Sequence, residues 1–355
     1  MSDPLIWVLI PYFIEDGRLD GETFENEDTK TELAQAFHSL GMPWIWQPVV
    51  LANIDNVVSQ IKRYRQRRPV IVFNFCDGLD SDGSPGPSVV RALEAAGIPF
   101  TGADSQFYDI STSKLRMKKL FRSAGVSTSP YQVLPDEGPV RGACKRLGAP
   151  VIVKPEISAA SVGISLRSRV FTDAEIAARR DELKNNKTLR HFATGKVFAE
   201  HFVDGREFTV FLVGDWRQPD KVRCFPPAER VFDSTLPASE RFLSFDRYWD
   251  YYREETVPPS GKYFFQFEAV GPDLAPALSD LALRAFCAVR GVSYGRVDIR
   301  MESTTGELFV LEVNANPEVT DERQTTTGYI LEIAGVRFPE LLGMFMEDVL
   351  ARETK

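Results

Sequence analysis

YGRVDIRM, residues 294–301, and LFVLEVN, residues 308–314, are the stretches of sequence that decide the fold. Polar and apolar side chains alternate along each stretch, and this pattern predicts two β-strands with one buried face. The short polar segment between them, residues 303–307, predicts a turn that joins the strands into an antiparallel hairpin. The second strand is expected to place four side chains on one face: Leu308, Val310, Glu312 and Asn314.

The hairpin is expected to bring polar side chains of the two strands together. With the turn centred near Thr305, Asp298 lies opposite Glu312 and Arg296 lies opposite Asn314, to within about one residue. Facing carboxylates repel each other unless a cation lies between them, and a set of oxygen ligands suits Mg²⁺. An exposed polar face with a charge pair to Arg296 is the alternative interpretation.

The first third of the chain alternates strands and helices. Hydrophobic runs at residues 6–10 and 69–75 predict buried strands, and the spacing at residues 29–40 and 87–96 predicts helices. Such alternation favours a parallel sheet with helices on both faces. The fold class expected is therefore α/β.

A second unit is expected to begin at Ser111-Thr112-Ser113, which provides N-cap chemistry for a helix over residues 114–124. An apolar strand at residues 151–153 then ends at Lys154, and a loop of small residues follows at 158–163. An ammonium group at a strand end beside such a loop is suited to a phosphate. A solvated lysine is the alternative.

Residues 200–207, EHFVDGRE, allow two interpretations. They form either a simple strand-turn-strand or an adenine-binding hinge, in which Phe202 packs against the base and Glu207 accepts from ribose hydroxyls. The segment 225–262 is rich in proline and aromatic residues and has no regular period, so no element is assigned to it. A helix is expected at residues 273–289.

Composition excludes several classes of protein. The formal charge of -8 over 355 residues argues against a large nucleic-acid interface, which needs a basic face. No apolar stretch is long enough to predict a membrane span, and the N-terminal apolar run, broken by Pro11, suits a buried strand better than a signal peptide. We therefore expect a cytoplasmic protein. The cysteines and histidines are scattered, which favours neither a zinc site nor disulfides.

Several motifs, taken in order, resemble the D-alanine:D-alanine ligase branch of the ATP-grasp family. They are VIVFNFCDG, STSKLRMKKLFRSAGV, PVIVKP, SVGIS, FAEHFVDGREFTV, YGRVDIR and FVLEVNANPEVT. The resemblance implies a three-domain ATP-grasp fold, α+β in its ATP-grasp part, with ATP between the central and C-terminal domains. It implies an N-terminal domain at residues 1–112, a central subdomain at 113–199 and a C-terminal domain at 200–355.

The resemblance also implies roles for individual residues. Asp298, Glu312 and Asn314 match the ligands of Mg²⁺ (or Mn²⁺), and Arg296 matches the arginine that stabilises an oxyanion during amine attack. ATP-binding roles are implied for Lys114 and Lys154 at the phosphates, Ser161 in the covering loop, Glu200, His201, Phe202 and Val203 in the hinge, Glu207 at the ribose, and Ile152 and Leu311 at the base. Dimers are common in this family, so the resemblance is consistent with a homodimer.

The sequence departs from the family around the substrates. The usual glycine-containing loop with an acidic residue is not visible in IPYFIEDGRLDG, and Ala160 stands where a serine is common. Glu318 replaces the glycine that follows the metal-binding strand, and no Ser-Leu pair comes after it. Arg323 or the run Thr325, Thr326 and Thr327 is the candidate to hold the carboxylate of the incoming amino acid, although Arg323 could also be a surface residue.

These departures predict an ATP-dependent ligase whose two substrate pockets have been rebuilt. The expectation is C–N bond formation between a phosphate-activated small molecule and an amino-acid amine in specialised metabolism. One example is the addition of serine or threonine to mycosporine-glycine in mycosporine-like amino acid biosynthesis. A D-alanine:D-alanine ligase of peptidoglycan synthesis and a non-catalytic ATP-binding protein are the alternatives.

Overall fold

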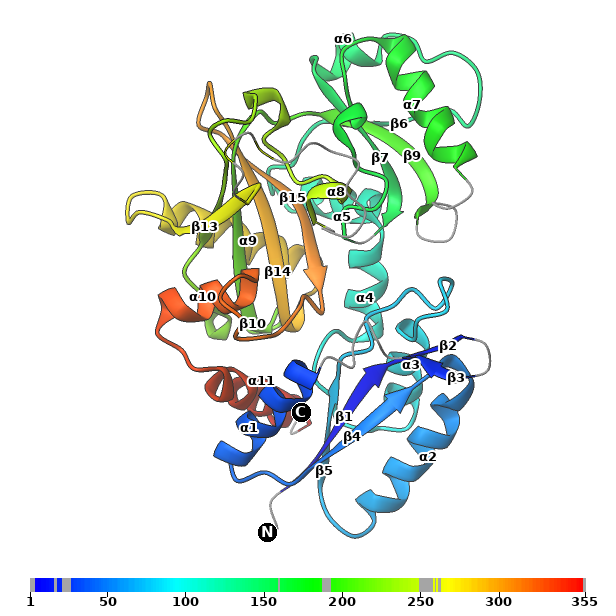
Figure 1. Ribbon diagram of the computed structural model, residues 1–355, viewed down its shortest axis with the longest axis vertical. Coiled ribbons are helices and arrows are strands. Elements are labelled where there is room, and N and C mark those ends of the chain that lie inside the picture. The colour runs from blue at the N-terminus through cyan, green and yellow to red at the C-terminus, as the bar shows by residue number, and fades with distance from the viewer. Residues whose placement is uncertain are drawn as a thin grey trace.

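The computed structural model describes residues 4–15, 18–20, 27–158, 160–186, 193–248, 258, 260 and 263–353. Three main sheets follow one another along the chain and are stacked along the long axis of the molecule (Figure 1). Part of the segment after the first strand, and part of the loop between residues 249 and 262, lie outside the described residues. So does His191.

The N-terminal sheet is parallel and buried, as the sequence predicts. Its strand order is β4 (Trp44–Val49), β1 (Leu5–Pro11) and β5 (Val70–Asn74). Every residue of β1 is buried, because helices cover both faces of a parallel sheet. The covering helices are α1 (Glu27–Ser39), α2 (Ile54–Arg65) and α3 (Pro87–Ala95), and a short hairpin, β2 (Phe13–Glu15) and β3 (Arg18–Asp20), lies beside the sheet.

Two consecutive helices connect this sheet to the rest of the molecule. The expected N-cap at Ser113 is confirmed, because its hydroxyl accepts from the Arg116 N–H at the start of α5 (Lys114–Ser123). Residues 111 and 112 do not take part in this cap. They end α4 (Ser105–Thr112), a helix that was not predicted from the sequence and that Asp104 caps.

A four-stranded antiparallel sheet follows. Its order is β6 (Tyr131–Val133), β9 (Ala193–His201), β7 (Val151–Ser158) and β8 (Arg169–Val170), and it carries α6 (Ala143–Leu147) and α7 (Asp173–Asn185). The strand expected to end at Lys154 instead continues through Pro155 to Ser158. Lys154 therefore projects from the middle of a strand, because β7 pairs with β9 both before and after a bulge between Pro155 and Ile157.

The third sheet contains six strands. Its path runs β13 (Phe265–Ala269), β12 (Ala228–Phe232), β10 (Gly205–Asp215), β14 (Val292–Glu302) and β15 (Leu308–Ala315), and β11 (Arg223–Cys224) pairs with β10. The helix α9 (Ala275–Ala288) packs on it, and α8 (Phe245–Tyr248) precedes β13. β12 and β13 lie in the region left unassigned from sequence. Because β9 and β10 belong to different sheets, residues 200–207 connect two sheets and do not form a hairpin.

The predicted pairing at the centre of the hairpin is confirmed. Asp298 pairs with Glu312 and Arg296 pairs with Asn314. The face predicted for β15 is wrong, because a bulge places Val310 opposite Ile299 and leaves Leu311 as the extra residue. Leu308 and Val310 therefore pack into the core on the face opposite to Glu312.

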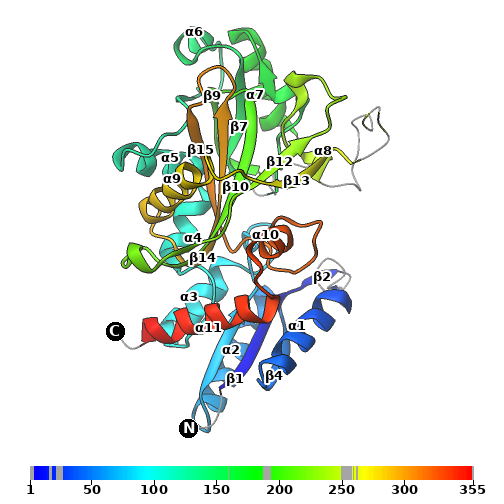
Figure 2. The same ribbon diagram turned by 90° about the vertical axis from the view of Figure 1, so that its left-hand side faces the viewer.

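The two C-terminal helices close the fold. α10 (Thr326–Ala334) and α11 (Phe338–Glu353) lie between the six-stranded sheet and the N-terminal sheet (Figure 2). Phe338 and Phe345 share one apolar cluster with Ile6 of β1 and Phe211 of β10, so the core is continuous from the first strand to the last helix. Among the helices of the described ranges, none has the length and apolar composition needed to cross a bilayer.

Candidate active site

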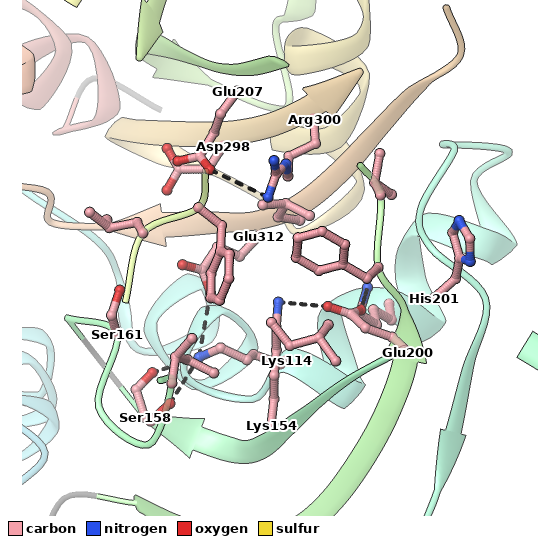
Figure 3. A pocket seen from close by; sticks show the side chains of 18 of the residues that line it. Lys114, Lys154, Ser158, Ser161, Glu200, His201, Glu207, Asp298, Arg300 and Glu312 are labelled. Atoms are coloured by element: carbon pink, nitrogen blue, oxygen red, sulfur yellow. Dashed lines mark hydrogen bonds and ion pairs between the residues drawn. The ribbon is translucent and has the colours of Figure 1, made fainter. Parts of the chain in front are cut away.

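A pocket lies between the four-stranded and six-stranded sheets. Lys114 and Lys154 enter it from one side, and Glu207 and Asp298 enter from the other (Figure 3). All the residues to which the resemblance gives an ATP-binding role line this pocket: Lys114, Ile152, Lys154, Ser161, Glu200, His201, Phe202, Val203, Glu207 and Leu311. Asp298 and Glu312 line it as well.

Two lysines share one buried carboxylate at the base of the pocket. Lys154 Nζ lies 2.6 Å from Glu200 Oε1, and Lys118 Nζ lies 2.5 Å from Glu200 Oε2. Burial on its own would raise the pKa of Glu200, but the two ammonium groups outweigh it and lower the pKa to about 2. The Glu200 side chain thus orients lysines, while its backbone remains part of the sheet.

The residues after Glu200 build an apolar wall. Phe202 packs edge-on against Phe242 at 5.4 Å between ring centroids, and both join Ile152 in one buried cluster. The N–H groups of His201 and Phe202 donate to carbonyls of neighbouring loop residues. A flat apolar surface of this kind suits a planar heterocycle.

A row of alternating charges crosses the six-stranded sheet. Glu207 on β10 lies between Arg230 of β12 and Arg300 of β14, its cross-strand neighbours. Arg230 forms an ion pair with the Glu207 carboxylate, and Arg300 Nη1 lies 4.0 Å from Glu207 Oε2. The Arg300 guanidinium also stacks 5.1 Å from the Phe202 ring centroid. This row joins the apolar wall to the charged end of the pocket.

Asp298 is held by donors from three strands. Arg296 donates to both of its oxygens at 3.0 Å, Thr209 Oγ1 donates at 2.9 Å, and Asn314 Nδ2 donates at 2.8 Å. Burial would raise the pKa of Asp298, but Arg296 overcomes it and keeps the pKa below its usual value. Asp298 is therefore a carboxylate anion poised beside a guanidinium.

Glu312 faces the lysine side of the pocket. Its Oε2 lies 3.4 Å from Lys114 Nζ, which also donates to the Ser158 carbonyl at 2.6 Å. The loop beyond Ser158 turns through two residues with left-handed backbone, Ala160 (φ 47°) and Ser161 (φ 61°). Consecutive residues of this kind are uncommon and occur at ligand-binding loops. Lys114 thus ties this loop to the strand that carries Glu312.

The donor set of the hairpin fits a hard divalent cation. Asp298, Glu312 and Asn314 offer two carboxylates and one amide on one face of the sheet, and only oxygen atoms would be needed as ligands. The Asn314 amide nitrogen faces Asp298, so this side chain would turn its oxygen inward to join the set. Within the described ranges, no group of three or more His, Cys, Asp or Glu side chains gathers elsewhere to hold a metal.

The structure places the expected carboxylate-binding residues away from this pocket. Arg323 forms an ion pair with Glu332 at 2.6 Å and lines a separate depression between α1, α10 and α11. Thr325 caps α10 and Thr326 begins that helix. The Thr327 hydroxyl is buried and donates to the carbonyl of Glu318 at 2.5 Å. Their role toward a substrate remains a prediction, while their visible role is to shape the loop before α10.

Three charged residues of the pocket were given no role from the sequence: Lys118, Arg230 and Arg300. Lys118 follows Lys114 by four residues, so helical spacing alone puts both on one face. Arg300 shares the polar face of β14 with Asp298, and this alternation could have identified it. Arg230 lies on β12, in the segment whose irregular composition concealed the strand.

A fold of this kind, with a pocket between two antiparallel sheets that combines paired lysines, an apolar wall and facing carboxylates, defines an ATP-grasp enzyme. Residues 120–347 match the model of the D-ala D-ala ligase C-terminus family. The chain belongs to the D-alanine–D-alanine ligase family and is an ATP-dependent carbon–nitrogen ligase of the ATP-grasp type.

The chain is similar to several members of this family. D-alanine–D-alanine ligase B of Xanthomonas campestris is 31% identical over 301 residues, covering 84% of this chain and 83% of that protein. The D-alanine–D-alanine ligase of Halorhodospira halophila is 31% identical over 275 residues, covering 77% and 78%.

Solved structures share the fold over the whole chain. The D-alanine–D-alanine ligase from Bacillus anthracis complexed with ATP has a TM-score of 0.68 at 18% identity, covering 100% of this chain and 99% of that one. The VanG D-Ala:D-Ser ligase from Enterococcus faecalis has a TM-score of 0.67 at 17% identity, covering 98% and 100%.

Proposed function

We propose that this protein uses ATP to phosphorylate a substrate oxygen, either of a carboxylate or of a cyclohexenone, and then joins the activated carbon to the amine of an amino acid. The observation that carries the proposal is the single pocket in which the lysine pair, the apolar wall and the Asp298–Glu312 pair meet. The Bacillus anthracis protein with this fold is complexed with ATP, which supports the same ligand here.

The adenine would rest on the apolar wall. Phe202 and Ile152 offer one flat surface, and Leu311 offers the other because the β15 bulge turns it toward the pocket. Since the N–H groups of His201 and Phe202 are already bonded, we assign the hinge donor to Val203. Glu207 would accept from the ribose hydroxyls while Arg230 and Arg300 hold its carboxylate in place.

The phosphates would lie on the charged side. Lys114 and Lys154 would each exchange part of a carboxylate contact for phosphate oxygens, and the Ser161 loop would cover them. Mg²⁺ or Mn²⁺, when bound, would neutralise phosphate charge, and Asp298, Glu312 and Asn314 are the residues that would hold it. With the phosphate charge offset, the remaining task of the pocket is to hold the attacking oxygen close to the terminal phosphorus.

The reaction proceeds in two steps. A substrate oxygen attacks the terminal phosphorus, and the bond to ADP breaks to leave an acyl phosphate, or an enol phosphate in the cyclohexenone case. The amine then attacks the carbon that carries the phosphate, the amine loses a proton, and phosphate leaves with the bridging oxygen. Arg296, fixed by its two bonds to Asp298, would stabilise the oxyanion formed during the second step.

D-alanine is the first candidate for both substrates. The Xanthomonas campestris and Halorhodospira halophila proteins, which are similar to this chain in sequence, are both D-alanine–D-alanine ligases. Glu318 favours a second candidate with a different acceptor. Its carboxylate lies near enough to Arg296 for that charge to act on its pKa, although burial dominates and raises the pKa.

A fold of this type accommodates an acceptor other than D-alanine, because the Enterococcus faecalis protein is a D-Ala:D-Ser ligase. The addition of serine or threonine to mycosporine-glycine is the narrower form of this second candidate. It rests only on the departures at Ala160, Glu318 and the loop before α10. Three domains divided near residues 112 and 200, a homodimer and a cytoplasmic location are further parts of the proposal.

The test is ADP release with ATP, Mg²⁺ and a panel of amino acids that begins with D-alanine and includes serine, threonine and a cyclohexenone core. We expect ADP release from the wild type with at least one pair of substrates. Glu312→Gln should lower that rate about 100-fold or more, because one anionic ligand of the metal is lost.

Glu307→Gln is the matched control, since Glu307 is exposed in the turn of the same hairpin. It should keep the wild-type rate. Equal rates for Glu312→Gln and the wild type would remove the metal from the proposal. A wild-type protein that binds ATP without releasing ADP for any pair would favour the non-catalytic alternative.

A further inference from the structure

Lys118 is a buried cation of the pocket to which the roles above assign no task. Its side chain is 1% exposed, and its ammonium lies 2.5 Å from Glu200 Oε2. Lys154 holds the other oxygen of the same carboxylate and is 15% exposed. One lysine is thus sealed in the interior and the other reaches the pocket, with Glu200 between them.

This arrangement solves an electrostatic problem. When a nucleotide's phosphates attract Lys154, the contact between Lys154 and Glu200 weakens. A carboxylate buried as deeply as Glu200 cannot remain charged without a partner. Because Lys118 stays beside Glu200, the carboxylate keeps its charge and its orientation while Lys154 is shared with the phosphates.

A chain of hydrogen bonds also fixes Lys118 to β15. Its ammonium donates to Thr128 Oγ1 at 2.9 Å, and that hydroxyl donates to the Val310 carbonyl at 2.8 Å. The Val310 N–H donates to the Ser127 carbonyl at 2.9 Å. Val310 directly precedes the bulge that presents Leu311 and Glu312, so this chain of bonds joins β9 to β15.

We propose that Lys118 is a positioning residue, which holds Glu200 ionised and anchored to β15 so that Lys154 is presented to the phosphates of the nucleotide. The inference rests on the proposed function, since it takes ATP as the ligand. It predicts that Lys118 contributes to the affinity for phosphates far more than to the affinity for the adenine and ribose.

The test compares equilibrium dissociation constants for ATP and for adenosine. In Lys118→Met, ATP affinity should fall about 10-fold to 100-fold, while adenosine affinity changes by less than about threefold. Lys119→Met is the matched control, because Lys119 is the exposed neighbour on the same helix. It should leave both constants as in the wild type. A purely structural role for Lys118 would lower both affinities together, and that result would overturn the proposal.

Thr128→Val provides a second variant if Lys118→Met does not fold, because it removes a hydroxyl and leaves every charge in place. The ratio of the two affinities should shift in the same direction by about threefold. An unchanged ratio in a folded Thr128→Val protein would then overturn the proposal. A wild type that binds ATP no more tightly than adenosine would instead overturn the proposed function, and this inference with it.

Discussion

At the residue scale, the pocket depends on carboxylates that are each paired with a cation. Glu200 contacts two lysines, Asp298 contacts Arg296, and Glu312 contacts Lys114. The cations lower the pKa of Glu200 and of Asp298, and the pairing holds the lysines and Arg296 in place. A nucleotide triphosphate brings negative charge to the same cations, so on binding these cations would exchange part of their contact with the carboxylates for contact with the phosphates.

Glu200 gives a pH dependence with a definite sign. Its pKa is about 2 in the folded protein against an ordinary value of 4.5, so the folded state binds this proton less tightly than the unfolded state does. The contribution to stability is complete above about pH 4.5 and is lost as the pH falls toward 2. It amounts to about 3 to 4 kcal/mol, because one pKa unit corresponds to about 1.4 kcal/mol.

Urea unfolding of the wild type and Glu200→Gln between pH 2 and 6 measures this contribution. The variant should be less stable by about 3 kcal/mol or more at pH 6, because two buried ammonium groups then share a neutral amide. The difference should shrink as the pH falls. A constant difference across this range would show that the carboxylate charge is not what stabilises the fold.

At the scale of elements, the β-bulge in β15 decides what the hairpin presents. Without the bulge, in which Leu311 is the extra residue, an uninterrupted alternation would put Val310 and Glu312 on one face. With it, Val310 enters the core, whereas Leu311 and Glu312 both line the pocket. A single irregular residue thus lets one strand provide both a wall for a base and a ligand for a cation.

The sequence predicted the Asp298–Glu312 pairing because the polar alternation in β14 is strict. It could not predict the bulge, since Leu311 has the same character as its neighbours and only pairing with β14 reveals the extra residue. Arg230 was missed because β12 is short and lies within an irregular segment. The helix α4 was missed because its single clear signal is the Asp104 cap.

A contact between α1 and the loop before α10 is expected to respond to pH. Glu32 accepts from the Asp321 N–H and from Thr320 Oγ1. Burial, and then the nearby Asp321 carboxylate, raise the pKa of Glu32 to about 7 from 4.5. The folded state therefore binds this proton more tightly, and stability decreases as the pH rises from about 4.5 to 7.

Glu32→Gln should remove this slope, so the melting temperature of the variant relative to the wild type should increase between pH 5 and 8. Differential scanning calorimetry at the two pH values measures the effect. Glu347→Gln, an exposed glutamate on α11, is the control and should show no such change. A Glu32→Gln protein that loses stability equally at both pH values would indicate that the contact needs the charged carboxylate.

At the scale of the whole molecule, one apolar core joins the N-terminal sheet to the six-stranded sheet. α11 shares this core with β1 and contacts the six-stranded sheet, and α5 contacts both β7 of the four-stranded sheet and β15. The family resemblance in the sequence predicted the ATP-grasp fold with its N-terminal parallel sheet. It could not define the substrates, because the residues around Glu318 depart from the family where the acceptor would bind.

The central claim is that a substrate oxygen is phosphorylated before the amine attacks, and isotope transfer tests it most directly. The oxygens of the group to be activated, the carboxylate of D-alanine or the ring ketone of a cyclohexenone substrate, are labelled with a heavy oxygen isotope, and the released phosphate is examined by mass spectrometry. The account predicts that each phosphate carries one labelled oxygen, because the bridging oxygen leaves with it. Unlabelled phosphate formed along with the C–N product would contradict the account.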